Sequence, residues 1–374
     1  MFSVYVHLPF CPYICPYCDF AKWPLRRSEA GAYLAALTAE ISKEPRRAAE
    51  SIFFGGGTPN TYDAATIAAL TKTLREHFAG AQHQEISIEV NPENVRPGDF
   101  ETYVESGINR VSIGVQSFIP AEIATLGRRH TPEQIVTVVD SARNTGIRSV
   151  SLDLIFGVPG QTARSWQRSL DRAVASGVDH ISTYGLTVEP GTPYEIWRER
   201  EPAAFPNDAT EAELYGRAMD TLAAAGFEQY EISNFAKPGH RCAHNENYWS
   251  NGEYVGLGVG AASYRDGVRS VHTRGLQTYI AAAAAGELIP GESERLEGPA
   301  RTGEAIMLAL RTSQGVDLTG FKERYGVDVA ATYRREIDEY RVEGLLELGD
   351  GYMRLTRRGR FLANDVCAAF VAPA

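Results

Sequence analysis

The chain has 374 residues, of which 44% are hydrophobic and 22% charged, so it is long enough for one large globular core and a smaller second domain. Its formal net charge of −10 disfavours a general nucleic-acid binder, because such proteins carry a basic excess that neutralises phosphates. The apolar tract at 279–285 is too short to span a bilayer, so we expect a cytoplasmic protein without a transmembrane segment.

The first predicted strand, residues 3–8, leads into a proline-rich loop with three of the five cysteines, Cys11, Cys15 and Cys18. Thiolates this close together can converge on one soft metal centre. Zinc would need a fourth nearby Cys or His, but none follows in sequence, and His7 lies inside the predicted strand. Three cysteines therefore suit a [4Fe–4S] cluster with one iron left open. The alternatives are buried free thiols and a disulfide, which the odd number of cysteines disfavours.

Short β-branched segments alternate with amphipathic helical patterns through the first two thirds of the chain. The predicted strands are residues 3–8, 51–54, 85–90, 110–115, 149–156 and 180–186. The predicted helices are residues 27–43, 64–78, 132–144, 163–175 and 209–225. This alternation indicates an α/β fold with a parallel sheet, whose ligand-binding residues lie at the carboxyl ends of the strands. Six such units fit an open (βα)6 barrel and a doubly wound sheet equally well.

Polar residues follow or interrupt the predicted strands near these ends. The run Gly55-Gly56-Gly57-Thr58 would let a ligand approach the backbone closely, although a tight turn is the usual explanation of such a run. Glu89 and Asp153 lie in otherwise apolar strands, where a carboxylate is costly unless it is paired or faces a cavity. For each residue taken alone, a structural role is the better interpretation. Further polar candidates are Gln116, Arg128 and Thr187.

Beyond these units, the segment Cys242-Ala243-His244-Asn245-Glu246-Asn247-Tyr248-Trp249 combines a thiol, a histidine and aromatic residues. A lone histidine in such surroundings is more often a hydrogen-bonded structural residue than a ligand, and Cys242 is more simply a buried thiol than a second soft ligand. The run Gly256-Leu257-Gly258-Val259-Gly260 is similar to a dinucleotide-binding fingerprint. It opens no convincing helix, so we interpret it as a close-packing loop.

From about residue 299 the pattern changes. Helical stretches are predicted at 301–310, 318–325 and 330–343, apolar runs at 345–348 and 352–355, and a last helix at 356–370. The turn Gly349-Asp350-Gly351 between the two apolar runs predicts a β-hairpin.

Together these motifs resemble the radical S-adenosylmethionine (SAM) family. The C-x3-C-x2-C spacing with the aromatic Tyr17 before Cys18 resembles the family's cluster motif, and Gly57-Thr58 resembles its glycine motif. The resemblance implies an open (βα)6 partial barrel, a [4Fe–4S] cluster on Cys11, Cys15 and Cys18, and SAM bound at the open iron.

The resemblance also implies the contacts that SAM would make. Arg128 would pair with the carboxylate of the methionine part, for which a planar guanidinium is well shaped. Gln116 and Asp153 would hydrogen-bond the ribose hydroxyls, and Glu89 would contact the methionine end. Tyr5 and Tyr17 would pack at the cluster and the adenine. Gly57 and Thr58 would contact the methionine amino group, and the backbone of Thr187 would contact the adenine.

The order of the motifs resembles the coproporphyrinogen-oxidase-like branch of this family, whose C-terminal domain is winged-helix-like. The implied segments are 1–235, the radical SAM domain; 236–298, a connecting region with the H-N-x-x-Y-W element; and 299–374, the winged-helix-like domain. The acidic balance of the chain disfavours DNA binding by this last domain.

Two groups of this branch fit the implied chemistry, the oxygen-independent coproporphyrinogen III oxidases and the haem chaperones named HemW. The oxidase signature has a fourth cysteine, where this chain has Phe20, and an N-terminal extension, whereas ten residues precede Cys11 here. The H-N-x-x-Y-W element resembles the chaperone group and makes His244 a candidate haem-binding residue.

We therefore expect a carrier that binds haem, a [4Fe–4S] cluster and SAM, and passes haem to client respiratory proteins. The oxidase is the alternative, and a structural zinc protein is a third class. The sequence leaves open the client, the axial haem ligands and the cleavage of SAM, as well as a homodimer and a peripheral association with membranes.

Overall fold

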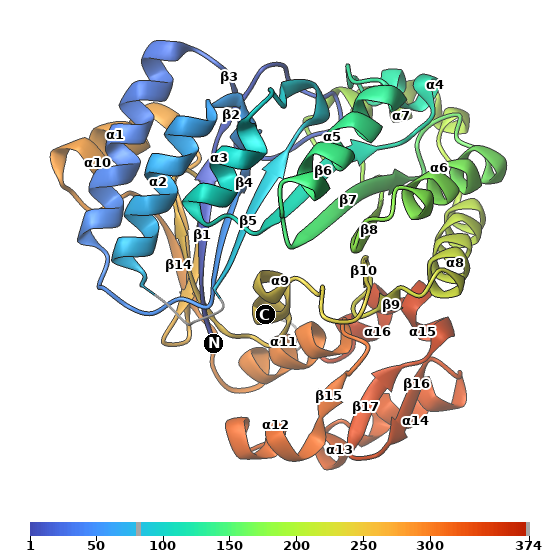
Figure 1. Cartoon of the computed structure of the whole chain (residues 1–374). Coiled ribbons are helices and arrows are strands. Elements are labelled where there is room, and N and C mark those ends of the chain that lie inside the picture. Colours follow the sequence, from blue (N-terminus) through green and yellow to red (C-terminus); the bar gives the residue numbers. More distant parts are fainter. Residues whose placement is uncertain (80–83, 372–374) are drawn as a thin grey trace.

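The computed structural model describes residues 1–79 and 84–371. Its main sheet has the strand order β14-β13-β12-β11-β1-β4-β5-β6-β7-β8-β10-β9 among these residues (Figure 1). The six consecutive strands β1 to β8 within this order are all parallel to their neighbours, which confirms the predicted open six-unit barrel with its parallel sheet. Their bounds are β1 (Phe2–Leu8), β4 (Ser51–Gly56), β5 (Glu85–Val90), β6 (Arg110–Gln116), β7 (Ser149–Phe156) and β8 (His180–Gly185).

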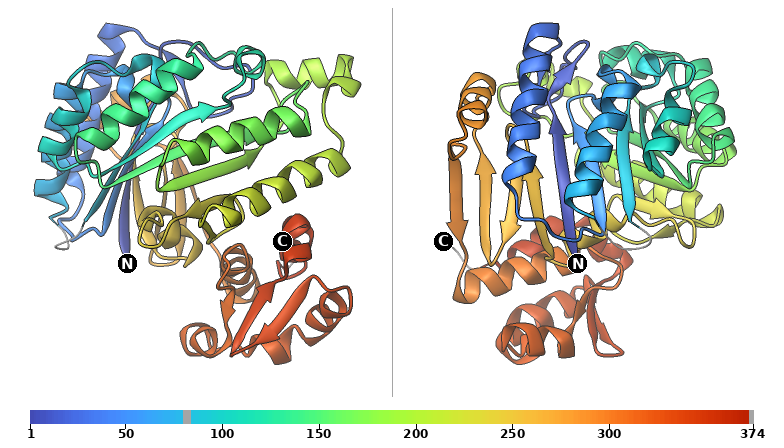
Figure 2. Two further views of the ribbon diagram at one scale, coloured as in Figure 1. Left: turned by 45° about the vertical axis from the view of Figure 1, so that its right-hand side comes forward. Right: turned by 60° about the vertical axis from the view of Figure 1, so that its left-hand side comes forward.

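Helices cover the outer face of these strands (Figure 2). The predicted bounds of α1, α5 and α6 coincide with the observed ones, and α5 and α6 each begin at a capping box. Thr131, for example, forms a capping box with Gln134, and Pro132 occupies the first turn. The covering helices are α1 (Arg27–Lys43), α2 (Ala64–His77), α3 (Asp99–Ser106), α5 (Pro132–Asn144), α6 (Ala163–Ala175) and α8 (Asp208–Ala224). Shorter elements are η1 (Pro59–Thr61), η2 (Pro92–Asn94), α4 (Pro120–Thr125), α7 (Pro193–Arg200) and η3 (Pro202–Ala204).

The cysteine loop is enclosed by two short strands that the sequence did not predict. Strand β2 (Phe10–Cys11) pairs in parallel with β3 (Trp23–Pro24) in a separate small sheet. The pairing fixes both ends of the loop directly beyond β1. The cysteines are thereby held at the carboxyl-end edge of the barrel strands.

The residues predicted as a connecting region, 236–298, are part of the main sheet. Strand β11 pairs in parallel with β1, and three antiparallel strands extend the sheet beyond it. Helix α10 packs against α1, far from it in sequence. The main sheet therefore continues past residue 235, where the sequence predicted the end of the radical SAM domain. The elements between residues 228 and 295 are β9 (Glu228–Gln229), β10 (Asn234–Ala236), α9 (Ala243–Trp249), β11 (Glu253–Leu257), β12 (Ala262–Arg265), β13 (Val268–His272), α10 (Leu276–Ala285) and β14 (Gly291–Arg295).

The glycine run after β11 is a close-packing loop, as predicted. Gly258 has φ +105°, and a Cβ there would lie 2.3 Å from the hydroxyl of Tyr33. Its backbone N–H donates to Glu40 Oε2 at 2.9 Å, while Val259 N donates to the Tyr33 hydroxyl at 3.2 Å. The glycines thus let β11 approach α1 closely.

The C-terminal domain has its own small sheet, in the order β15-β17-β16, and its own apolar core. The predicted hairpin is present, and Asp350 and Gly351 in its turn have φ of 52° and 81°. Two helices predicted as continuous are each divided in two, at Tyr333 and at Leu362. The elements are α11 (Gly298–Leu310), β15 (Val316–Asp317), α12 (Leu318–Tyr325), α13 (Val329–Thr332), α14 (Arg334–Val342), β16 (Leu346–Gly349), β17 (Tyr352–Leu355), α15 (Arg357–Phe361) and α16 (Ala363–Ala368).

Over the described residues, no helix combines the length and the apolar character needed to cross a membrane.

Candidate functional site

A cavity of about 460 Å³ lies at the carboxyl ends of the barrel strands, and we call it the mouth cavity. Cys11, Cys15 and Cys18 all line it as free thiols. Cys11 is buried and lies 3.4 Å from the donating hydroxyl of Thr58. The backbone N–H of Cys18 donates to the carbonyl of Cys15 at 3.3 Å, which turns the loop back on itself.

The donor set of this loop fits an iron–sulfur cluster better than a single ion. Among the described residues, no group of three Cys, His, Asp or Glu side chains converges closely enough to hold one metal ion. A cluster of four irons and four sulfides is wider than an ion, so its thiolate ligands stand further apart. Three cysteines on the wall of one cavity satisfy that requirement.

The glycine motif is anchored beside the first cysteine. The N–H of Gly57 donates to the carbonyl of Leu8 at 2.9 Å, and the N–H of Thr58 donates to the carbonyl of Phe10 at 3.0 Å. A Cβ on Gly57 would lie 2.6 Å from the carbonyl carbon of Pro9, so a side chain at this position would force the strand ends apart. The backbone of this motif can therefore reach a ligand in the mouth cavity.

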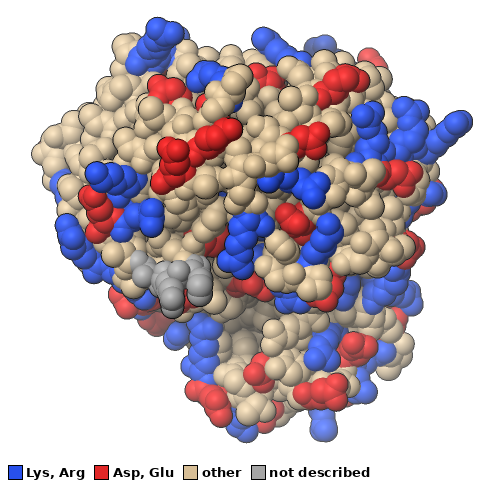
Figure 3. Space-filling view, in the orientation of Figure 1, with Lys and Arg blue, Asp and Glu red and all other residues tan. Residues whose placement is uncertain are grey.

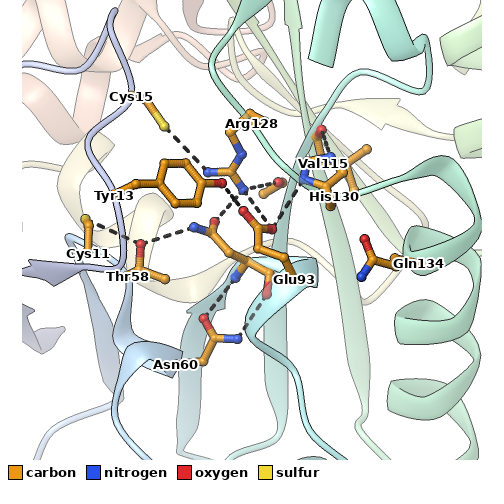
Figure 4. A network of polar contacts seen from close by, with 12 residues as sticks. Cys11, Tyr13, Cys15, Thr58, Asn60, Glu93, Val115, Arg128, His130 and Gln134 are labelled. Carbon is orange, nitrogen blue, oxygen red and sulfur yellow. Dashed lines mark hydrogen bonds and ion pairs between the residues drawn. The ribbon is translucent and has the colours of Figure 1, made fainter. Parts of the chain in front are cut away.

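A chain of hydrogen bonds joins the glycine motif to Arg128 (Figure 4). The side-chain amide of Asn91 donates to the Thr58 hydroxyl at 3.1 Å, and its oxygen accepts from Arg128 Nη2 at 2.6 Å. Arg128 Nη2 also donates to the carbonyl of Gly114 at 2.8 Å. Asn60 holds Asn91 in place through two bonds of 3.0 and 3.1 Å to its backbone.

Glu93 supports Arg128 from the other side. Its carboxylate accepts a hydrogen bond from the Tyr13 hydroxyl and lies 3.8 Å from Arg128 Nη2 and 3.3 Å from His130 Nδ1. Burial alone would raise the pKa of Glu93, but the contacts with His130, Arg128 and Tyr13 outweigh burial and lower the pKa to about 2. The same carboxylate raises the pKa of Arg128 against the opposing effect of burial. Both groups are therefore charged at neutral pH.

Sequence reasoning missed Asn60, Asn91, Glu93 and His130 as parts of this network. The signal that could have found two of them is the run Asn91-Pro92-Glu93-Asn94 directly after the third predicted strand, where polar residues meet the ligand edge. Asn60 and His130 carry no comparable local signal, because their partners lie in other units of the barrel.

Gln116 lines the mouth cavity because β6 is irregular at its end. The pairing register with β7 shifts between Gly114 and Gln116, and Gln116 has φ +63°, a left-handed conformation rare for a residue with a side chain. In a regular strand, successive side chains alternate between the two faces of the sheet. The register shift interrupts this alternation at Gln116.

Glu89 and Asp153 line both the mouth cavity and a smaller inner cavity of about 210 Å³ below it. Burial, and then the negative charge of Asp153, raise the pKa of Glu89 to about 8. Burial also raises the pKa of Asp153, although hydrogen bonds from Ser182 and Ser112 act to lower it. The Ser112 hydroxyl lies 2.9 and 3.0 Å from the two carboxylate oxygens of Asp153. Glu89 is thus mostly protonated at neutral pH.

The remaining predicted SAM residues occupy different depths. Tyr17 and Thr187 line the mouth cavity, and the Tyr17 ring packs against Tyr194 with 6.1 Å between centroids. Tyr5 lies deeper, on the wall of the inner cavity, where its hydroxyl is 3.1 Å from His7 Nδ1. Phe20 lines the mouth cavity with 69% of its surface exposed.

His244 lies in α9 beneath the barrel, away from the mouth cavity. Its Nδ1 is 2.9 Å from the hydroxyl of Ser51 and its Nε2 is 2.8 Å from the hydroxyl of Tyr248, and it stacks on Phe53 at 5.1 Å. Burial lowers its pKa to about 3, so the ring is neutral. A haem-ligating role would require one of these buried hydrogen bonds to break.

Cys242 precedes α9 and is also buried, which raises its pKa to about 12. Its thiol lies 3.5 Å from Glu85, whose carboxylate also accepts from the backbone N–H groups of Ala243 and His244. The carboxylate of β5 thus satisfies the free donors at the start of α9.

Comparisons with known proteins agree with this geometry. The model of the radical SAM superfamily matches residues 5–173, and that of the HemN C-terminal domain matches residues 298–362. The heme chaperone HemW of Bacillus subtilis (strain 168) is 33% identical, over 99% of both chains. The heme chaperone HemW of Mycobacterium tuberculosis (strain H37Rv) is 37% identical, over 98% of this chain and 93% of its own. The crystal structure of the coproporphyrinogen III oxidase HemN of Escherichia coli has a TM-score of 0.86 at 24% identity, over 99% of this chain and 90% of that one.

Proposed function

The chain belongs to the radical SAM superfamily and, within it, to the family of the heme chaperone HemW proteins, and from this membership we propose that it binds haem and delivers it to client proteins. The observation that carries the proposal is the extent of the match. Relatives with the chaperone name are 33% and 37% identical along nearly the whole chain, whereas the likeness to the oxidase is one of fold.

Membership of the superfamily implies a [4Fe–4S] cluster and SAM, and the proposal places both in the mouth cavity. Cys11, Cys15 and Cys18 would hold the cluster, and SAM would bind between the glycine motif and Arg128. When bound, this pair of cofactors supplies one-electron cleavage of the sulfonium. The network of Asn60, Asn91 and Glu93 would fix Arg128 before SAM arrives, so less ordering is needed on binding.

Each of the residues implied for SAM would then contact a different part of the ligand. Arg128 would pair with its carboxylate, the Gly57-Thr58 backbone and Glu89 would face its ammonium group, and Gln116 and Asp153 its ribose. Tyr17 and Thr187 would border the adenine end, while Tyr5 would support Glu89 from the inner cavity.

A second function, oxygen-independent coproporphyrinogen III oxidation, is supported by the fold and by the residues around the mouth cavity that the family resemblance implies for SAM. Phe20 argues against oxidase activity, because a phenyl ring at the cavity rim offers neither a thiol nor an acid–base group.

We propose that the client proteins are respiratory haem proteins, to which this chain delivers haem from the cytoplasm.

Anaerobic reconstitution followed by haem titration tests the proposal. We expect one haem per chain with a shifted Soret band, and no conversion of coproporphyrinogen III in the presence of SAM and a reductant. Absence of haem binding together with formation of protoporphyrinogen would assign the chain to the oxidases.

A further inference from the structure

A cavity of about 490 Å³ lies between the large domain and the C-terminal domain. Helix α9 and the residues just after it form one wall, and α11, β15 and α12 form the other. Figure 3 shows the surface hollowed where the two domains meet. We call this space the interdomain cleft, and its wall includes Trp249, Ala309, Phe321, Arg324 and Tyr325.

Helix α9 separates the interdomain cleft from the barrel interior. His244 and Tyr248 of the H-N-x-x-Y-W element line the inner cavity, whereas Trp249, the last residue of the helix, lines the cleft. The motif is therefore divided between two sides of one helix. Its tryptophan is the member that faces a space large enough for a ligand.

Aromatic and small side chains together line the interdomain cleft. The rings of Phe321 and Tyr325 lie 4.5 Å apart at an angle of 33°, and Trp249 faces the cleft from α9. Ala305 and Ala309 on α11 leave room between them. Aromatic faces beside short side chains suit a flat, largely apolar ligand.

Charged side chains of both signs line this space, namely Arg241, Arg324, Glu246 and Asp317. Arg241 forms ion pairs with Glu228 and Glu246, at 3.3 and 3.5 Å. Arg324 donates to the carbonyls of Ser250 and Asn251 at 2.8 and 2.7 Å, and no ion pair with a carboxylate is found for it among the described residues. Its guanidinium is therefore the cation of the cleft that can pair with a carboxylate of a ligand.

The other cavities fit a large planar ligand less well. The mouth cavity would already hold the cluster and SAM, and the inner cavity of about 210 Å³ is smaller than ligand pockets of roughly 300–1,000 Å³. A depression of about 970 Å³ between α2 and α3 is lined by polar and small residues, without an aromatic side chain among the described ones.

We propose that the interdomain cleft holds the tetrapyrrole cargo. The macrocycle lies against Trp249, Phe321 and Tyr325, and one of its carboxylates reaches Arg324. This inference rests on the proposed haem-binding function and puts the cargo on the side of α9 opposite to the inner cavity. Cargo and cofactors then occupy separate sites, and release of the cargo to a client does not require the mouth cavity to empty.

Titration of the full-length, cluster-loaded protein with hemin tests the site, followed by the Soret difference spectrum and by quenching of tryptophan fluorescence. Trp249→Ala removes an aromatic wall, and Ala309→Trp fills the cleft. Both are expected to raise the Kd roughly tenfold or more. Trp197→Ala, on α7 far from the C-terminal domain, is the matched control and should change the Kd less than about twofold.

The outcomes separate the two proposals. If the wild type binds hemin and both cleft variants keep its affinity, the cleft assignment is wrong while the haem-binding function stands. If the wild type binds no hemin, the proposed function fails, and the cleft assignment with it. Cluster absorbance and far-ultraviolet circular dichroism identify a variant that has not folded, in which case the other cleft variant decides.

Discussion

The side chain of Asn60 clamps the backbone of Asn91 from both sides, accepting from its N–H at 3.0 Å and donating to its carbonyl at 3.1 Å. These two bonds fix the amide that lies between Thr58 and Arg128. Asn60 does not line the mouth cavity, so we expect it to act on the proposed SAM site through Asn91.

Replacement of Asn60 by Ala should therefore loosen the site without removing a SAM contact. We expect SAM affinity to fall about tenfold and the free energy of unfolding to fall by about 1–3 kcal/mol, because two partly buried backbone groups of Asn91 lose their partner. Equilibrium dialysis with SAM and urea unfolding measure the two effects. Asn144→Ala, at the exposed end of α5, is the control and should leave both unchanged. Unchanged SAM affinity in Asn60→Ala would show that Asn91 needs no support.

Each cysteine of the loop should be required for the iron–sulfur cluster. Cys11→Ala, Cys15→Ala and Cys18→Ala are expected to lose iron and the brown absorbance after anaerobic reconstitution, because two thiolates cannot hold the cluster. Cys367→Ala, in the core of the C-terminal domain, removes a thiol that is buried like that of Cys11 and should retain both signals. Colourless wild-type protein that contains zinc would contradict the prediction.

Binding of SAM at pH 7 should release a proton from Glu89. The pKa of this carboxyl is raised to about 8 in the free site, so the group is mostly protonated, and an ammonium group beside it would lower the pKa and expel the proton. Calorimetric titration in two buffers of different ionisation enthalpy measures the release. The release should disappear in Glu89→Gln and shrink in the wild type above about pH 9. Equal heats in both buffers would rule out this role.

The stability that Glu93 provides should depend on pH in the acid range. Its pKa is lowered to about 2 in the folded protein, against about 4.3 in an unfolded chain, so its contribution is present above about pH 5 and is lost as the pH falls towards 2. Glu93→Gln should lower the free energy of unfolding at pH 7 by an amount on the order of 3 kcal/mol at most. The difference from the wild type should narrow at pH 3. A difference that is the same at both pH values would assign the effect to packing.

His244 should act through stability and leave haem binding intact. His244→Ala breaks hydrogen bonds to Ser51 and Tyr248, and we expect it to cost about 1–3 kcal/mol of unfolding free energy. Because both ring nitrogens are engaged, the Soret maximum and the haem stoichiometry should match those of the wild type. A shifted Soret maximum in folded His244→Ala protein would instead identify the histidine as an axial ligand.

The sequence predicted the local elements of the barrel closely, because each unit carries its own periodicity and end signals. The helices α1, α5 and α6 begin and end where their patterns indicated. The pairing of β11 with β1 was missed for the opposite reason. It joins strands about 250 residues apart, and no local pattern reports such a contact.

The sequence predicted those residues of the candidate site that belong to a recognisable motif. The cysteines and the Gly57-Thr58 run have fixed spacing, so the family resemblance reached them directly. Asn60 was missed because its role depends on Asn91 in a neighbouring unit. The placement of His244 beneath the barrel depends on α9 folding back under the strands, which the H-N-x-x-Y-W letters do not encode.

Strand β1 lies between β4 and β11, and its second neighbour is synthesised only when residue 257 leaves the ribosome. Synthesis of the roughly 200 residues between the ends of β4 and β11, at about 5–20 residues per second, leaves β1 with one unpaired edge for roughly 10–40 seconds. A nascent chain with an exposed parallel edge is open to mispairing with other strands. Binding of that edge by a chaperone would prevent such mispairing until β11 is synthesised.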